Sequence, residues 1–251
     1  MSIYTNTGLV THVKKALELK TKYMWAGTLN PITDAYITQK VDQCIKAGVP
    51  PSRSGYTDAR VKELRKIAGQ GYYGVDCVCL VKSYLWGGIG CPMYDSKYDV
   101  NANVMYERAT VKGKISTMPE VPGLILYSKT HPHVGIYIGN GETIESTLGA
   151  RGDGVVKRKL DSFWEYWFKC PFIEYKDIPA NMVGQLSRVM FAYKAKVRAR
   201  PRKDSACLGE YLPGQTATIV IGSGTKDPVT GYEYVRIAGD TERWVVRSAI
   251  K

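Results

Sequence analysis

The stretch that decides the fold is a short run that begins like a helix, Asp76-Cys77-Val78-Cys79-Leu80-Val81. Glycines make the approach to it irregular, Asp76 is a favourable N-cap residue, and the apolar run ends at Gly87-Gly88. These signals predict a helix with Cys77 in its first turn. A thiol at a helix N-terminus meets free backbone N–H groups and the positive end of the helix dipole, which favour the reactive thiolate.

A histidine begins the second decisive run, His133-Val134-Gly135-Ile136-Tyr137-Ile138-Gly139. Its period-two alternation predicts a strand, and the Gly139-Asn140-Gly141 sequence predicts a hairpin-type turn. Residues 142–147 have strand composition, so His133 and Glu145 can lie on one face of an antiparallel pair. An imidazole beside a thiol takes its proton and later returns it, and a carboxylate would hold the imidazole tautomer. The chain is therefore predicted to be a Cys-His hydrolase.

Four motifs occur in an order that resembles the NlpC-type cysteine peptidases of bacterial cell walls. They are Tyr23-Met24-Trp25-Ala26-Gly27, Asp76-Cys77, Pro122-Gly123-Leu124-Ile125-Leu126-Tyr127 and the run from His133 to Gly141. The resemblance covers roughly residues 10 to 176 and implies an α+β, papain-like catalytic domain over residues 1–178. It implies Cys77 as nucleophile, His133 as general base and Glu145 as the third polar residue. It also implies that Tyr23 lies beside the nucleophile, that Asp76 helps to receive the free amine of a stem peptide, and that no cofactor is needed.

The chain departs from this family pattern in three places. Val78 and Cys79 stand where Ser and Gly are common, and the third polar position holds Glu145 instead of His, Asn or Gln. The segment before Asp76 is long, and it predicts a helical insertion at about 28–74 with helices at about 31–47 and 57–68. The insertion could form a wall of the substrate cleft, although packing alone explains it equally well.

Zinc is the rival interpretation of the same residues. Cys77, Cys79, His131 and His133 offer two thiols and two imidazoles. Zinc-binding cysteines usually stand two to four residues apart with tightening turns, whereas Cys77 and Cys79 would diverge on one helix. We therefore expect no metal, with Cys79 in the core and His131 in a structural position.

A second domain is expected at residues 190–251, where short strands alternate with turn residues. Their order resembles a bacterial SH3-like domain, a small β-barrel that binds the wall in cell-wall enzymes. Residues 186–251 contain twelve Lys and Arg against six Asp and Glu, a surplus of six positive charges. Such a domain would attract anionic wall polymers. The candidate wall-binding residues are Arg198, Arg200, Tyr232 and Trp244.

Composition limits the remaining classes. The chain has 251 residues, a formal net charge of +12 and 44 % hydrophobic residues, enough for a packed core. Beyond charge it has no nucleic-acid motif, and no run approaches the roughly twenty apolar residues of a membrane span. A signal peptide is not evident, so we expect synthesis in the cytoplasm, reduced cysteines and action at the wall after release.

These observations predict a peptidoglycan hydrolase. The resemblance implies a γ-D-glutamyl-L-diamino acid endopeptidase, and the fused wall-binding domain resembles that of a phage or prophage endolysin. Two alternatives stay open. One is an N-acetylmuramoyl-L-alanine amidase with the same Cys-His site, and the other is a catalytically inactive wall-binding protein.

Overall fold

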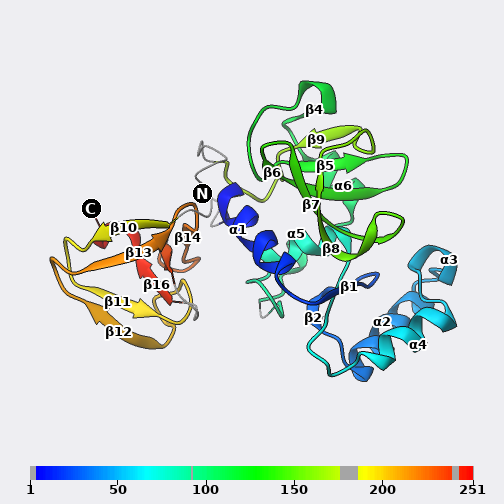
Figure 1. Cartoon of the computed structure of the whole chain (residues 1–251), viewed down its shortest axis with the longest axis horizontal. Coiled ribbons are helices and arrows are strands. Elements are labelled where there is room, and N and C mark those ends of the chain that lie inside the picture. The colour runs from blue at the N-terminus through cyan, green and yellow to red at the C-terminus, as the bar shows by residue number, and fades with distance from the viewer. Residues whose placement is uncertain (1–3, 92, 176–185, 239–242, 251) are drawn as a thin grey trace.

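The computed structural model describes residues 4–91, 93–175, 186–238 and 243–250. Figure 1 shows a mixed α/β part, which contains the helices α1 to α6, and a separate part built mainly of strands. The predicted boundary between the two domains, around residues 176–185, lies outside the described residues.

A six-stranded antiparallel sheet forms the centre of the α/β part. The strand order is β4 (Lys112–Lys114), β9 (Tyr166–Phe168), β5 (Ile125–Ser128), β6 (His133–Gly139), β7 (Glu142–Gly149) and β8 (Gly152–Lys159). The predicted hairpin is confirmed as β6 and β7. Asn140 in its turn has a φ of 56°, a left-handed conformation that Asn tolerates better than most residues.

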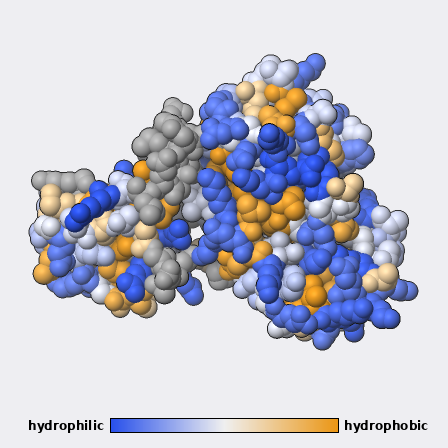
Figure 2. All heavy atoms as spheres, in the orientation of Figure 1, coloured by the Kyte–Doolittle hydropathy of each residue, from blue (hydrophilic) through white to orange (hydrophobic). Residues whose placement is uncertain are grey.

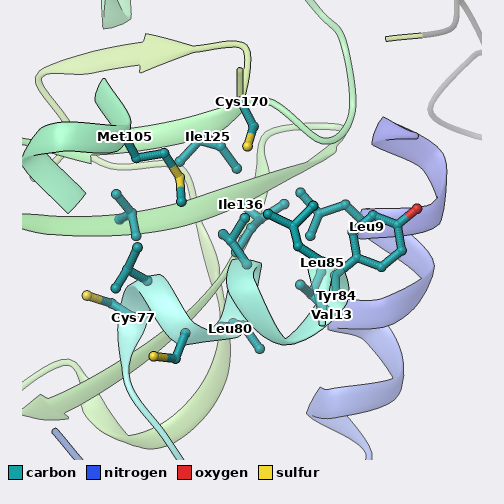
Figure 3. Packing of buried hydrophobic residues seen from close by; sticks show 14 of the residues in the cluster. Leu9, Val13, Cys77, Leu80, Tyr84, Leu85, Met105, Ile125, Ile136 and Cys170 are labelled. Atoms are coloured by element: carbon teal, nitrogen blue, oxygen red, sulfur yellow. The ribbon is translucent and has the colours of Figure 1, made fainter. Parts of the chain in front are cut away.

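The helices α1 (Asn6–Leu17) and α5 (Cys77–Leu85) contact this sheet and each other. The helix predicted after Asp76 is thus confirmed. Side chains from both helices and from β5 and β6 form the main core, and Figure 3 shows Cys77 at the edge of this cluster, in the first turn of α5. The nucleophile candidate therefore lies on a helix that is fixed by burial along its whole length. The helix α6 (Ala102–Arg108) and the short 3-10 helices Ser96–Tyr98 and Ile115–Thr117 complete this part.

A smaller sheet carries the predicted helical segment. Its strand order is β1 (Thr21–Tyr23), β3 (Tyr73–Val75) and β2 (Thr28–Pro31). Between β2 and β3 lie the helices α2 (Asp34–Lys46), α3 (Pro51–Ser54) and α4 (Asp58–Lys66). The two predicted helices are present and shorter than expected, and they begin after Thr33 and Thr57, whose side chains cap their first turns. They enclose their own core of Met24, Ile32, Ile37, Cys44, Tyr56 and Leu64.

The C-terminal strands form one antiparallel sheet with a second, separate core. The order is β10 (Leu186–Met190), β13 (Thr216–Val220), β15 (Glu233–Ile237), β16 (Arg243–Val246), β11 (Ala195–Arg198) and β12 (Cys207–Tyr211), and β14 (Thr225–Lys226) pairs with β15. A 3-10 helix follows at Arg247–Ala249. We call this part the C-terminal module. Its SH3-like character stays a prediction.

Hydrophilic residues cover much of the face shown in Figure 2, with smaller apolar patches between them. Within the described ranges, every helix is too short or too polar to cross a membrane.

Candidate active site

Cys77 is positioned by the capping of α5. Asp76 has an extended backbone, and its Oδ1 accepts a hydrogen bond from the Cys79 N–H at 2.5 Å. Its Oδ2 accepts one from the Ala26 N–H at 2.9 Å, which ties the helix to the turn after β1. Both carboxylate oxygens of Asp76 thus hold the backbone around Cys77. The expected contact of Asp76 with a substrate amine stays a prediction.

His133 and Glu145 meet on one face of the β6–β7 pair. Gly135 is the register partner of Glu145, and His133 lies two residues before Gly135, so all three share a face. His133 Nε2 lies 2.7 Å from Glu145 Oε2. The Cys77 side chain is a hydrogen-bonding and electrostatic neighbour of the same ring. Because Nε2 is engaged by Glu145, Nδ1 is the nitrogen that serves Cys77.

The charges around His133 favour the imidazolium. Burial alone would lower the pKa of His133, but interactions with Cys77 and Glu145 outweigh it and raise that pKa to about 9. For Glu145, burial would raise the pKa, and hydrogen bonds from His133 and Arg151 lower it below the ordinary value. The raised pKa of His133 and the lowered pKa of Glu145 both favour an imidazolium beside an ionised carboxylate, with the Cys77 side chain next to the same ring.

Arg151 is a second partner of the buried carboxylate. The Glu145 side chain is 0 % exposed, and its Oε1 accepts hydrogen bonds from Arg151 Nη2 at 2.7 Å and Nε at 3.1 Å. Arg151 Nη1 in turn donates to Asp161 Oδ2 at 3.0 Å. Arg158 Nε is 4.0 Å from the same Glu145 oxygen. Glu145 is therefore compensated on both sides, which a buried carboxylate requires.

Two aromatic residues support both cations. The His133 ring lies over Trp164 with a centroid distance of 5.7 Å and an interplanar angle of 20°, and it meets Phe163 edge-on. The Arg151 guanidinium lies 4.0 Å from the Phe163 ring centroid. Trp164 fits because residue 135 is glycine, since a Cβ there would come within 2.7 Å of the indole. Phe163 and Trp164 thus fix the position of the His133 ring through these two contacts.

Tyr23 lies at the same end of the site. Burial raises the pKa of the Tyr23 hydroxyl, and the nearby Cys77 and Asp76 side chains raise it further. The phenol therefore stays protonated and can donate a hydrogen bond. The Tyr23 backbone is held by Asp153, whose Oδ1 accepts from the Tyr23 N–H at 3.1 Å. Arg60 of α4 pairs with the same carboxylate at 2.6 Å, which connects the helical segment to β8 beside the site.

The four residues of the zinc alternative do not form one cluster, because Cys79 and His131 lie apart from Cys77 and His133. Cys79 is 2 % exposed in the main core, and burial raises the pKa of its thiol well above the usual range. The His131 ring stacks on Phe163 at 5.8 Å. In the part of the chain that the structure describes, no group of three or more His, Cys, Asp and Glu side chains could hold a metal ion.

Sequence reasoning missed Arg151, Asp161, Phe163 and Trp164 as parts of the site. In the sequence, the aromatic run 163–168 indicates only packing, and Arg151 carries no local signal, because its partner is defined only when the β7–β8 hairpin forms. A glutamate that is buried on a strand requires a cation as partner. This requirement was the one sequence-level indication that Glu145 has a basic neighbour such as Arg151.

The predicted wall-binding residues lie in the C-terminal module. Trp244 is the register partner of Arg198 on the neighbouring strand, so this pair is adjacent. Arg198 Nη1 donates to the Ser205 carbonyl at 2.8 Å. Arg200 follows in the next turn, and Tyr232, 51 % exposed, precedes β15. Their role in binding a wall stays a prediction.

Solved structures similar to this chain include three proteins. The peptidoglycan hydrolase RipB from Mycobacterium tuberculosis is 16 % identical with a TM-score of 0.38, and the match covers 68 % of this chain and 65 % of RipB, just under two thirds of it. The P60 domain of an antigen from M. avium subspecies paratuberculosis is 18 % identical, with a TM-score of 0.37 and coverages of 68 % and 98 %. Ly7917, solved with the hydrolysis product of MDP, is 13 % identical, with a TM-score of 0.26 and coverages of 68 % and 83 %. No family model and no curated protein matches the chain.

Proposed function

We propose that this protein is a cysteine hydrolase that cleaves amide bonds in the stem peptide of peptidoglycan. The observation that carries the proposal is the Cys77–His133–Glu145 arrangement, with the thiol at a helix N-terminus and the carboxylate 2.7 Å from the imidazole. The substrate class is supported by the resemblance of the four ordered motifs to NlpC-type cell-wall peptidases.

The reaction follows from the positions of these groups. The Cys77 thiolate attacks the amide carbonyl carbon and forms a C–S bond, and the backbone N–H of Cys77, with the Tyr23 hydroxyl nearby, stabilises the oxyanion. The C–N bond then breaks as the His133 imidazolium gives its proton to the leaving amine. Water attacks the thioester while His133 takes a proton from it. The carboxylic acid leaves, and the thiolate is restored.

Glu145 and Arg151 act through His133 in this scheme. Glu145 accepts a hydrogen bond from the Nε2–H group, which fixes the ring and stabilises the imidazolium. Arg151 is a positioning residue, because its hydrogen bonds keep the buried carboxylate ionised and hold it in one orientation.

The scissile bond is proposed from the family resemblance as that between D-glutamate and the following diamino acid. The C-terminal module would hold the enzyme on the wall, and the combination of hydrolase and wall-binding module would suit an endolysin. The amidase alternative uses the same Cys-His chemistry at the muramoyl-L-alanine bond. The inactive wall-binding alternative is disfavoured by the paired charges at His133, which packing alone does not require.

Mass spectrometry of digested, purified peptidoglycan tests the proposal. Muropeptides cut after D-glutamate are expected, peptides free of amino sugar would indicate the amidase, and an unchanged digest would indicate the binding protein. Cys77→Ala should abolish cleavage, whereas Cys79→Ala is the matched control on the same helix and should keep most activity. Iodoacetamide should inactivate the enzyme. Inactivation by EDTA that zinc reverses would overturn the thiol mechanism.

A further inference from the structure

Two cationic side chains flank a tryptophan on one face of the C-terminal module. Arg236 of β15 is the register partner of Trp244 of β16, which is in turn the partner of Arg198 of β11. Directly paired residues point to the same side of a sheet. Val235 and Val245, their sequence neighbours, belong to the core of the module. The Arg236–Trp244–Arg198 row therefore lies on the face opposite that core.

Two members of this row, Arg236 and Trp244, border a cavity of about 510 Å³ between the module and the α/β part. Arg236 and Trp244 line it together with Arg200, and α1 and the turn at residues 87–90 lie across from them. Figure 1 shows α1 on the side of the α/β part that faces the module. The volume exceeds that of a single small ion and suits one or two units of a polyol or sugar.

Two of the side chains that line this cavity each carry a buried hydrogen-bond donor without a partner in the described ranges. Arg236 Nε and Trp244 Nε1 are buried atoms without a hydrogen-bond partner in the described ranges. A buried donor without an acceptor is costly, so most native donors find a partner, whether protein, water or ligand. Both atoms are donors only, so the partner that satisfies them must present acceptor oxygens.

The charge of the cavity wall selects an anion. The basic side chains that line it are His12, Lys15, Arg200, Arg202, Lys226 and Arg236, with no carboxylate among the described lining residues. Burial lowers the pKa of His12 to about 4, so the positive charge comes from the lysines and arginines. Arg202 is already paired with Asp204 at 2.6 Å, and Lys226 lies 3.6 Å from Glu174. Arg200 and Arg236 form no ion pair within the described residues, and their charge is available to a ligand.

We propose that this cavity binds a phosphorylated polyol or sugar unit of an anionic wall polymer, with Arg236 and Trp244 as its central contacts. Phosphate offers more acceptor oxygens than a carboxylate and suits donors that approach from several sides. The indole face suits the apolar side of a polyol or sugar ring. The wall origin of the ligand rests on the proposed function, whereas the phosphate site itself does not.

Binding can be measured on the full chain without any catalytic readout. The chain has five tryptophans, so a ¹⁵N-labelled sample gives five indole N–H signals, and Trp244→Phe identifies that of Trp244. Titration with inorganic phosphate and then glycerol 3-phosphate, at constant ionic strength, should shift the Trp244 signal saturably. Arg236→Gln should weaken binding by about tenfold, the factor expected from one lost charge-assisted hydrogen bond. Arg188→Gln is the matched control. Arg188 lies on β10, its Nη2 donates a hydrogen bond to the Thr216 hydroxyl, and it does not line the cavity.

Three results would overturn the proposal. They are the absence of a saturable shift, an equal shift with chloride or acetate, and unchanged binding in Arg236→Gln. The polymer source is tested by sedimentation with walls before and after hydrofluoric acid removes phosphodiester polymers. Treated walls should retain at least threefold less protein, and equal retention would refute that source. Trp244→Phe keeps an aromatic ring and loses the N–H, so its reduced sedimentation provides a second variant if Arg236→Gln does not fold.

Discussion

The strongest test of the site is to replace Glu145 and its partner Arg151, singly and together, by glutamine. From the sequence alone, Glu145→Gln should be mild, because an amide oxygen can still accept the hydrogen bond from His133. The structure changes this expectation. The carboxylate accepts from His133 on Oε2 and from Arg151 on Oε1, so acceptors are needed on both sides. A glutamine has one acceptor oxygen, and in either orientation its NH2 group faces another donor.

The size of the effect follows from these contacts. One hydrogen bond to a charged group contributes about 1.5–3 kcal/mol, and Glu145 is fully buried, so water does not replace the lost partner. At roughly 1.4 kcal/mol per tenfold in rate, kcat should fall about 10- to 100-fold in Glu145→Gln, close to the loss in Glu145→Ala. The double variant Glu145→Gln/Arg151→Gln restores a complementary arrangement. The side-chain oxygen at position 145 accepts a hydrogen bond from His133, and the NH2 group at position 145 donates to the side-chain oxygen at position 151. It should recover about tenfold over Glu145→Gln.

The assay is the turnover of soluble muropeptides, with kcat and KM measured separately and unfolding followed in urea. Lys157→Gln is the matched control, since Lys157 forms an exposed ion pair with Glu142 at 2.9 Å on the same two strands. It should leave kcat unchanged. A Glu145→Gln variant with nearly full activity, or a double variant no better than Glu145→Gln alone, would refute the reasoning.

Three further predictions concern the surroundings of the imidazole and the helical segment. Gly135→Ala should cost about 1–3 kcal/mol in urea unfolding and lower kcat, because its Cβ would displace Trp164 from beneath His133. Arg60→Gln should cost about 2 kcal/mol in the same measurement, because Asp153 loses its pairing with Arg60 and keeps that with Lys22. The profile of activity against pH should fall on the alkaline side near pH 9. The pKa of His133 is raised, so the imidazolium and the stability that it contributes persist above the ordinary His range and are lost as pH rises through about 9. A fall centred near pH 6.5 would contradict this.

The elements that sequence predicted well have strong local signals. The helix after Asp76 begins with an N-cap and ends at glycines, and the β6–β7 hairpin combines strict alternation with a tight turn. The short helix α3 was missed because four residues carry no periodicity, and Pro50 and Pro51 favour a turn equally well. In the C-terminal module β10, β12 and β14 carry weak sequence signals, since exposed edge residues such as those of β12 alternate weakly.

The contact between His133 and Glu145 could be predicted, but the residues that support it could not. Cys77 and His133 stand in motifs with a fixed local geometry, whereas Arg151 reaches Glu145 through a hairpin and Trp164 reaches His133 through a loop. Such contacts depend on tertiary packing, which a single sequence does not encode in any short pattern. Gly135 shows the same limit, because a glycine inside a strand indicates a close approach without naming what approaches.

The choice of glutamate as the third residue accounts for the rest of the cluster. A neutral Asn or Gln at position 145 could orient the imidazole without any counter-ion, whereas a buried glutamate must be compensated. Arg151 provides that compensation, and it brings its own requirements: Asp161 accepts a hydrogen bond from its Nη1, and Phe163 covers its guanidinium. The same aromatic pair then holds the His133 ring. The departure at one position is therefore coupled to four other residues, and a glutamate at that position should require a cation within hydrogen-bonding distance whenever it is fully buried.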